Sequence, residues 1–324
     1  MLVWGVFIAF IIICLALDLG VFNRTPHIIK TKEASIWTTV WVTLALGFSG
    51  IIYWLFADGI IDNPTQLTPN NAVLKYITGY LIELSLSIDN VFVIAVIFSS
   101  FAIPQKYQHE VLFWGILGAI VFRALMIFFG VALINKFDWI IYVFGVFLLY
   151  TAYKMLMHKE TEFNPKKSFV FRNLKKVMPV TSQMDGDKFF IRRLNVKAAT
   201  PLFVALMVIE LTDILFALDS IPAILAITAD PFLVFSSNIF AILGLRSMYF
   251  LISNMLSKFR FINYSLVVIL TFVGLKMLFG HYLKGIGYEM PEWLSLSVIF
   301  LALVGGVIAS IVIPETDESE EKIN

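Results

Sequence analysis

The chain of 324 residues is 59% hydrophobic and only 15% charged, and its mean hydropathy of +0.87 excludes a soluble domain of ordinary composition. The formal net charge of +1 argues against a nucleic-acid partner. The one cysteine, Cys14, excludes an intramolecular disulfide and a cysteine-rich metal site. These properties predict a polytopic membrane protein.

Apolar runs of about 20 residues, the length that crosses a hydrocarbon core, recur along the whole chain. The first run has no preceding Lys or Arg and no clear small-residue cleavage site, so we interpret it as a helix and not as a cleaved signal peptide. The fold class is then all-α, with about nine transmembrane helices. We expect them near residues 2–22, 36–56, 73–101, 109–134, 138–157, 200–227, 231–256, 261–280 and 293–313.

Basic residues gather in alternate loops. They lie in the segments 23–35, 158–198 and 257–263, and the long segment 158–198 alone carries ten Lys and Arg. By the positive-inside rule these loops face the cytoplasm. With nine spans, the N-terminus is then outside and the acidic tail PETDESEEKIN is cytoplasmic.

Acidic residues repeat with one spacing inside two expected helices. Glu83 is followed six residues later by Asp89, and Asp213 is followed six residues later by Asp219. At about 100° per residue, the second acid of each pair lies about 120° around the helix from the first. Either these helices are enclosed by protein on most sides or they are broken locally. Pro222 favours a break in the second acidic helix, because it leaves the carbonyl of Leu218 without its usual donor.

The repeat extends over two further helices in each half. ILGAIVFRALMIF (116–128) resembles AILGLRSMYFL (241–251) and aligns Arg123 with Arg246, and two later segments each begin with Phe and end in KML. Each repeat therefore contains three helices. Because this number is odd, consecutive repeats cross the membrane in opposite senses, as in many secondary transporters. Duplication in a passive scaffold would leave the same pattern.

The chain thus divides into five parts. We expect an N-terminal two-helix segment (1–72), a first three-helix repeat (73–157), a basic cytoplasmic loop (158–198), a second three-helix repeat (199–280), and a last transmembrane helix with the acidic tail (281–324).

The carboxylates inside the membrane call for compensation. Each costs about 2.5–3.5 kcal/mol if it is ionised and unpaired at a helix centre. Arg123 and Arg246 are candidate charge partners or gating residues. Two arginines cannot neutralise the five acids, which are Glu83, Asp89, Glu210, Asp213 and Asp219. Lys154 and Lys276 lie near helix ends, and we expect them to snorkel to the interface.

The surplus negative charge can be met by protonation, by water or by a bound cation, which are the components of a cation pathway. Oxygen ligands dominate the acidic helices, and hard oxygen sets suit Mn²⁺, Mg²⁺ or Ca²⁺. The alternative is that these residues are buried polar contacts that hold the helices in register, which requires the same kinds of side chain. The candidate metal ligands are Glu83, Asp89, Asn90, Glu210, Asp213, Asp219 and Ser220.

Several stretches resemble one known family. ALDLGVFNR (16–24), GYLIELSLSIDNVFV (79–93), VIELTDILFALDSIPAI (208–224) and SNIFAILGLRSMYFLI (237–252) are similar to the TerC family of integral membrane proteins, and most closely to its Alx branch. The resemblance covers nearly the whole chain. It implies a bacterial inner-membrane protein of a class historically labelled tellurium resistance, whose bacterial members are associated with manganese export. The family's acidic motifs fall on the seven candidate ligands.

The leading hypothesis is an alternating-access exporter of Mn²⁺ with no permanently bound cofactor and no enzymatic activity, whose partners are a divalent metal ion and the lipid bilayer. Outward movement of a divalent cation costs roughly 4.6 kcal/mol per 100 mV, which an inward H⁺ or Na⁺ flux could supply. Export of another cation such as Ca²⁺, or a membrane scaffold or assembly factor of the TerC type, are the alternatives. An intramembrane aspartyl protease is disfavoured, because the sequence lacks a YD plus GxGD pairing.

Overall fold

The computed structural model describes most of the chain. The described residues are 2–20, 29–63, 66–137, 139–157, 173, 176, 178–181, 183–193, 196–253, 261–285 and 290–313. About half of the basic loop 158–198, the basic residues Arg24, Lys258 and Arg260, and the acidic tail lie outside them.

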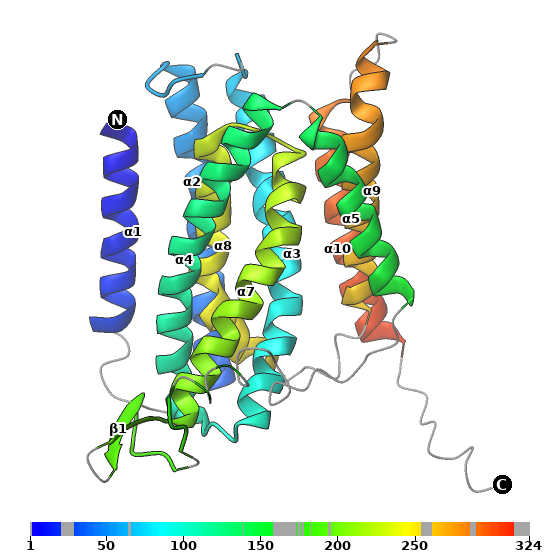
Figure 1. Ribbon diagram of the computed structural model, residues 1–324. Coiled ribbons are helices and arrows are strands. Elements are labelled where there is room, and N and C mark those ends of the chain that lie inside the picture. The colour runs from blue at the N-terminus through cyan, green and yellow to red at the C-terminus, as the bar shows by residue number, and fades with distance from the viewer. Residues whose placement is uncertain are drawn as a thin grey trace, which may run out of the picture.

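Helices make up most of the described structure, so the all-α class is confirmed (Figure 1). Nine helices are described, and eight are long and apolar enough to cross a membrane; the apolar stretch of the first, Leu2–Leu17, is shorter. The elements are α1 (Leu2–Gly20), α2 (Thr31–Ala57), α3 (Pro69–Ser100), α4 (Gln105–Lys136), α5 (Ile140–Met157), β1 (Phe190–Arg193), β2 (Val196–Ala199), α7 (Pro201–Leu225), α8 (Pro231–Ile252), α9 (Ile262–Gly285) and α10 (Glu292–Val312).

Side-chain caps set the start of two central helices. Thr68 precedes α3, and its hydroxyl accepts a hydrogen bond from the Asn71 N–H at 3.3 Å. Asp230 precedes α8, and its carboxylate accepts from the N–H groups of Phe232 and Leu233, both at 3.0 Å. Burial raises the pKa of the Asp230 carboxyl, and these two donors partly oppose that shift.

The two predicted repeats pack on one another. Helix α3 packs against α8, α7 packs against α4, and α5 packs against α9, while α2 covers α3 and α8 and α10 lies against α9 and α3. In Figure 1, α3 and α7 run in opposite directions, as do α4 and α8, and α5 and α9. If α3, α4 and α5 correspond to α7, α8 and α9, the contact of α3 with α8 is therefore equivalent to the contact of α7 with α4. The inverted-repeat relation itself stays a prediction.

Helix α8 is surrounded by other helices and packs against α2, α3 and α4. In its most apolar 18-residue window, 89% of the residues are buried inside the protein, the highest share among the eight candidate spans. Its buried residues include several polar ones: Ser236, Ser237, Asn238, Arg246 and Ser247. A helix surrounded by protein can carry such residues because other helices, and not lipid, meet them.

Helices α5 and α9 approach most closely at two glycines. A Cβ atom on Gly145 would lie 3.1 Å from the carbonyl oxygen of Gly274, and a Cβ on Gly274 would lie 3.0 Å from the carbonyl oxygen of Gly145. Small residues at a helix crossing permit this approach of two backbones.

Two local predictions differ from the structure. Helix α7 is continuous from Pro201 to Leu225, so the break expected beside Asp219 is wrong. Pro222 lies in the last turn, so only three helical residues follow it and the hydrogen bond that it cannot make to the Leu218 carbonyl lies near the helix end. The basic segment also contains an antiparallel hairpin, β1–β2, with Phe190 opposite Ala199, that the sequence did not predict.

Candidate ion-binding site

Arg123 of α4 joins the two acidic helices. Its Nε and Nη2 atoms donate hydrogen bonds to the two carboxylate oxygens of Asp213 on α7, at 3.1 and 2.7 Å. Its Nη1 atom donates to Oε1 of Glu83 on α3. The guanidinium is 1% exposed and the Glu83 side chain is fully buried. One cation therefore holds a carboxylate from each half of the chain, in the forked geometry that favours arginine.

Glu83 has a second donor that sequence reasoning missed. The side-chain amide of Asn238 on α8 donates to Oε2 of Glu83 at 3.0 Å. Asn238 is fully buried. The available signal was the polar group Ser236, Ser237 and Asn238 within an otherwise apolar segment. The two donors give each oxygen of Glu83 a partner, which fixes this carboxylate in place.

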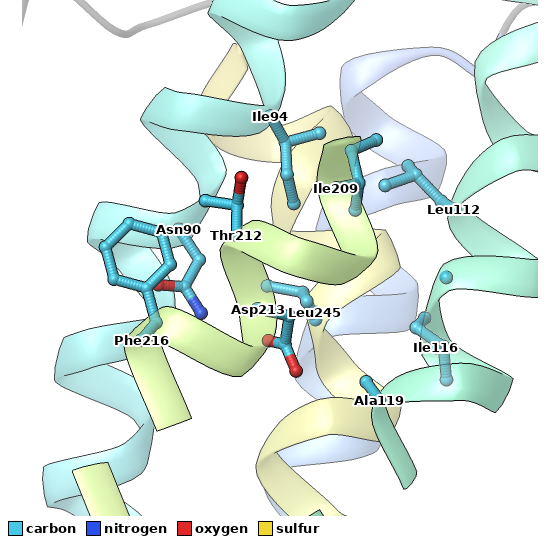
Figure 2. Close-up of a pocket in the computed structure, with 11 residues that line it drawn as sticks. Asn90, Ile94, Leu112, Ile116, Ala119, Ile209, Thr212, Asp213, Phe216 and Leu245 are labelled. Atoms are coloured by element: carbon cyan, nitrogen blue, oxygen red, sulfur yellow. The ribbon is translucent and has the colours of Figure 1, made fainter. Parts of the chain in front are cut away.

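A small cavity lies beside Asp213, between α3, α4, α7 and α8 (Figure 2). Its volume is about 20 Å³, which is room for about one water molecule. Its polar lining comes from Asn90, Thr212 and Asp213, and the rest is apolar, including Phe216 and Leu245. Such a cavity can hold one small polar or charged species that oxygen atoms reach from two helices.

Asn90 contributes an oxygen that has no partner in the described part of the chain. The residue is 3% exposed, and its side-chain Oδ1 accepts no hydrogen bond. The hydroxyl of Thr212 donates to the Val208 carbonyl at 2.7 Å and keeps its lone pairs available. A buried acceptor without a donor costs free energy, which a donor or a cation in the cavity would recover.

Asp89 and Asp219 form a second acidic pair, which lies beside α5 and apart from the pair held by Arg123. Oδ1 of Asp219 accepts a hydrogen bond from the Thr151 hydroxyl at 3.0 Å, and Lys154 interacts with the same carboxylate electrostatically. Asp89 lies close enough to Asp219 for the two charges to interact. The offset of about 120° around the helix separates Asp89 from Glu83 on α3. Sequence reasoning did not assign Thr151 to this pair.

Glu210 and Ser220 are buried without hydrogen bonds to described residues. Glu210 is 8% exposed, its Oε2 has no partner, and its carboxylate lies so close to Gly118 of α4 that a Cβ there would overlap it. Ser220 is 1% exposed, and its hydroxyl is also unpartnered among these residues. Glu210 interacts electrostatically with Asp213 one turn further along α7.

Arg246 lies in another part of the molecule from Arg123. It lines a cavity with Glu33, Trp37 and Trp41 of α2, and does not line the cavity beside Asp213. The structure thus distributes the seven candidate ligands over several places. Among the described residues, no group of three or more His, Cys, Asp or Glu lies close enough to hold one metal ion.

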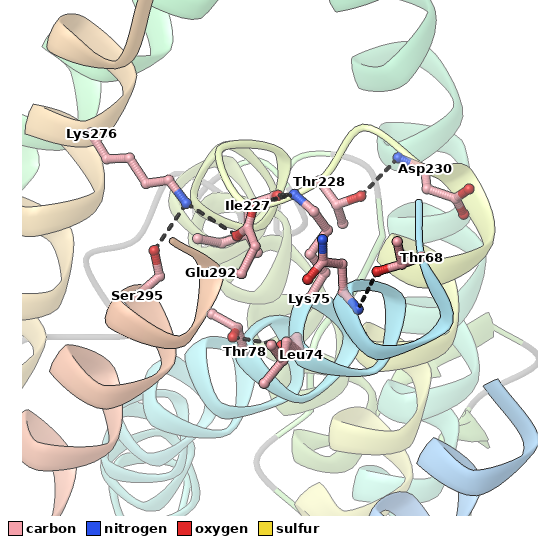
Figure 3. A network of polar contacts seen from close by, with 11 residues as sticks. Thr68, Leu74, Lys75, Thr78, Ile227, Thr228, Asp230, Lys276, Glu292 and Ser295 are labelled. Carbon is pink, nitrogen blue, oxygen red and sulfur yellow. Dashed lines mark hydrogen bonds and ion pairs between the residues drawn. The ribbon is translucent and has the colours of Figure 1, made fainter. Parts of the chain in front are cut away.

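An ionic network connects α10 to α3 and α9 (Figure 3). Glu292 accepts from Lys75 at 2.8 Å and from Lys276 at 3.5 Å. Lys276 also donates to the Ser295 hydroxyl at 2.9 Å, and Lys75 donates to the Ile227 carbonyl at 2.7 Å. The Lys276 side chain is only 14% exposed and pairs with Glu292 on α10, a partner that the sequence analysis did not predict. The expectation that it snorkels to the interface stays a prediction.

Comparisons with known proteins agree with the motifs. A family model described as "Integral membrane protein TerC family" matches residues 68–318. An uncharacterized membrane protein of Myxococcus xanthus is 47% identical over 324 residues, covering 99% of this chain and 96% of that protein. The "Putative membrane-bound redox modulator Alx" of Escherichia coli K12 is 43% identical over 304 residues, covering 94% and 92%. No solved structure matches. The chain belongs to the TerC family of integral membrane proteins, as its acidic motifs predicted.

Proposed function

We propose that this TerC family protein exports a divalent metal cation, Mn²⁺, from the bacterial cytoplasm across the inner membrane by alternating access. The observation that carries the proposal is the small cavity lined by Asn90, Thr212 and Asp213, where Asn90 has a buried oxygen without a partner in the described structure. Carboxylate, amide and hydroxyl oxygens are the ligands that a hard cation such as Mn²⁺ accepts.

The charges on the two acidic helices favour a cation. Five carboxyl groups lie on α3 and α7, and in the described structure two cationic side chains, Arg123 and Lys154, lie near them. Ionised carboxylates in excess attract a divalent cation, and protonation of some of them would provide exchange against H⁺. We therefore keep H⁺ or Na⁺ as the coupling ion, with the N-terminus outside and the C-terminus cytoplasmic.

The experiment is a measurement of cytoplasmic metal in bacteria that lack their own manganese exporters and are loaded with Mn²⁺. Cells with the intact protein should hold less Mn²⁺ than cells with the Asp89→Asn or Asp219→Asn variant at matched membrane levels. Asp185→Asn, at a 60%-exposed side chain in the segment before β1, is the matched control and should behave as the intact protein. Parallel loading with Ca²⁺ tests the other cation.

Equal Mn²⁺ in cells with the intact protein and in cells without it would refute manganese export. A phenotype that survives neutralisation of both aspartates would support the scaffold or assembly-factor alternative. The name of the Alx relatives refers to redox modulation. Cys14 is the one cysteine, so a disulfide within one chain cannot be the basis of such a role here.

A further inference from the structure

Arg123 occupies the site at which a transported cation would be expected. Its guanidinium makes two hydrogen bonds to Asp213, and the cavity beside Asp213 adjoins this pair. Building on the export function proposed above, we infer that the transported cation competes with Arg123 for Asp213, and that the exchange loosens the tie between α4 and α7.

The two carboxylates that Arg123 holds differ in their freedom to change partner. Glu83 is fully buried and keeps a second donor, Asn238, on its other oxygen. The Asp213 side chain is 11% exposed, and among the described residues its two oxygens accept hydrogen bonds from Arg123 alone. Asp213 is therefore the carboxylate that can exchange the guanidinium for another cation, while Arg123 stays on Glu83.

The cavity supplies the other ligands for the exchanged state. Asn90 presents a buried oxygen without a partner in the described structure, and Thr212 presents hydroxyl lone pairs one residue before Asp213. The cavity of about 20 Å³ accommodates one small species, so the ion enters with few or no waters. A dehydrated divalent cation needs such oxygen atoms to replace its hydration shell.

The exchange has a mechanical consequence. The hydrogen bonds from Arg123 to Asp213 connect α4 to α7, and the bond to Glu83 connects α4 to α3. When the ion takes Asp213, α4 stays tied to α3 and is released from α7 at this point. The ion thereby biases a two-state contact between helices, which alternating access requires.

Lysine at position 123 separates competition from a simple structural role. Arg123→Lys keeps the charge but cannot form the forked pair of hydrogen bonds with Asp213. The pair of residue 123 with Asp213, which competes with the ion, then loses one charge-assisted hydrogen bond. This loss should lower the Kd for Mn²⁺ by about tenfold. Export should become slower, because the arginine no longer recaptures Asp213 after the ion leaves.

The binding measurement uses the full chain in lipid nanodiscs, with the EPR signal of free Mn²⁺ as readout. Arg123→Lys should bind Mn²⁺ more tightly than the intact chain, and Arg192→Lys, on the exposed hairpin, should bind as the intact chain does. An unchanged or higher Kd in Arg123→Lys overturns the competition. A purely structural role would lower the melting temperature without this gain in affinity.

A second measurement keeps Arg123 in place. Gly130 of α4 and Leu225 of α7 face each other, since a Cβ on Gly130 would lie 3.0 Å from Leu225 Cδ1. In a Cys14→Ser background, the cysteine pair Gly130→Cys and Leu225→Cys should cross-link more slowly with a short bismaleimide when Mn²⁺ is present. Equal rates with and without Mn²⁺ refute the loosening of α4 from α7.

The two proposals fail in different ways. If the intact chain exports Mn²⁺ but Arg123→Lys does not bind Mn²⁺ more tightly, the export function is supported and the competition is refuted. If the intact chain neither binds nor exports Mn²⁺, both the export function and the competition are refuted.

Discussion

The crossing of α5 and α9 at Gly145 and Gly274 allows a prediction of stability with an internal control. An alanine methyl at Gly145 would lie 3.1 Å from the Gly274 carbonyl oxygen and 3.0 Å from Leu278 Cγ. These distances are shorter than ordinary contacts, so the helices must move apart by a few tenths of an ångström. Overpacking of this kind costs about 1–3 kcal/mol. The gain in helix propensity from Gly to Ala, about 0.8–1 kcal/mol, offsets part of that cost.

We therefore expect Gly145→Ala to lower the free energy of unfolding by up to about 2 kcal/mol. Gly274→Ala should do the same, because its Cβ would lie 3.0 Å from both the Gly145 carbonyl oxygen and the Leu149 side chain. Gly280 lies on the same helix α9, and a methyl group added there would meet nothing within 4 Å in the described structure, so Gly280→Ala should raise the free energy of unfolding.

The assay is reversible unfolding of the purified protein in mixed dodecylmaltoside and SDS micelles. The double variant Gly145→Ala, Gly274→Ala should cost less than the sum of the two single variants, because both methyl groups open the same contact. Stabilisation by all three single variants, or full additivity of the pair, would show that the two backbones are not in close contact.

The polar contacts give two further predictions. Glu292→Gln should lower the free energy of unfolding by about 1–3 kcal/mol in the same assay, because two largely buried lysines lose their carboxylate. Lys188→Gln, at an exposed pair, should leave the unfolding curve unchanged, and a comparable loss there would refute the burial argument. Thr151→Val removes the donor to Asp219 at nearly constant volume and should reduce Mn²⁺ export in loaded cells. Thr38→Val, whose hydroxyl has no partner in the described structure, should leave export unchanged; equal loss in both would assign the effect to packing.

The helices of this protein could be predicted from the sequence because a membrane imposes one length on them. The expected span 73–101 corresponds to α3, Pro69–Ser100, and the difference at its start comes from the Thr68 cap and from Pro69 in the first turn. The hairpin β1–β2 could not be predicted in this way, since no membrane constrains the segment that contains it.

The partners of the buried charges could not be predicted from spacing alone. Periodicity shows which side chains share a helix face, but it does not show which other helix meets that face. Arg123 and Arg246 align in the repeat, and yet Arg246 lies in a cavity lined by α2, a helix outside both repeats. Likewise Lys276 pairs with Glu292 on α10, which has no counterpart in the first repeat. The additional helices therefore make the two halves chemically unequal.

The central position of α8 has a consequence for how the protein is made. Its hydropathy is the lowest of the eight candidate spans, and nearly all of its most apolar window is covered by other helices. Lipid alone is a poor solvent for a segment that carries Asn238 and Arg246. Insertion of α8 during synthesis must therefore rely on helices that entered the membrane earlier, α2, α3 and α4, whose side chains receive it. Shortening the chain at its N-terminus would thus impair the membrane integration of a helix in the second half.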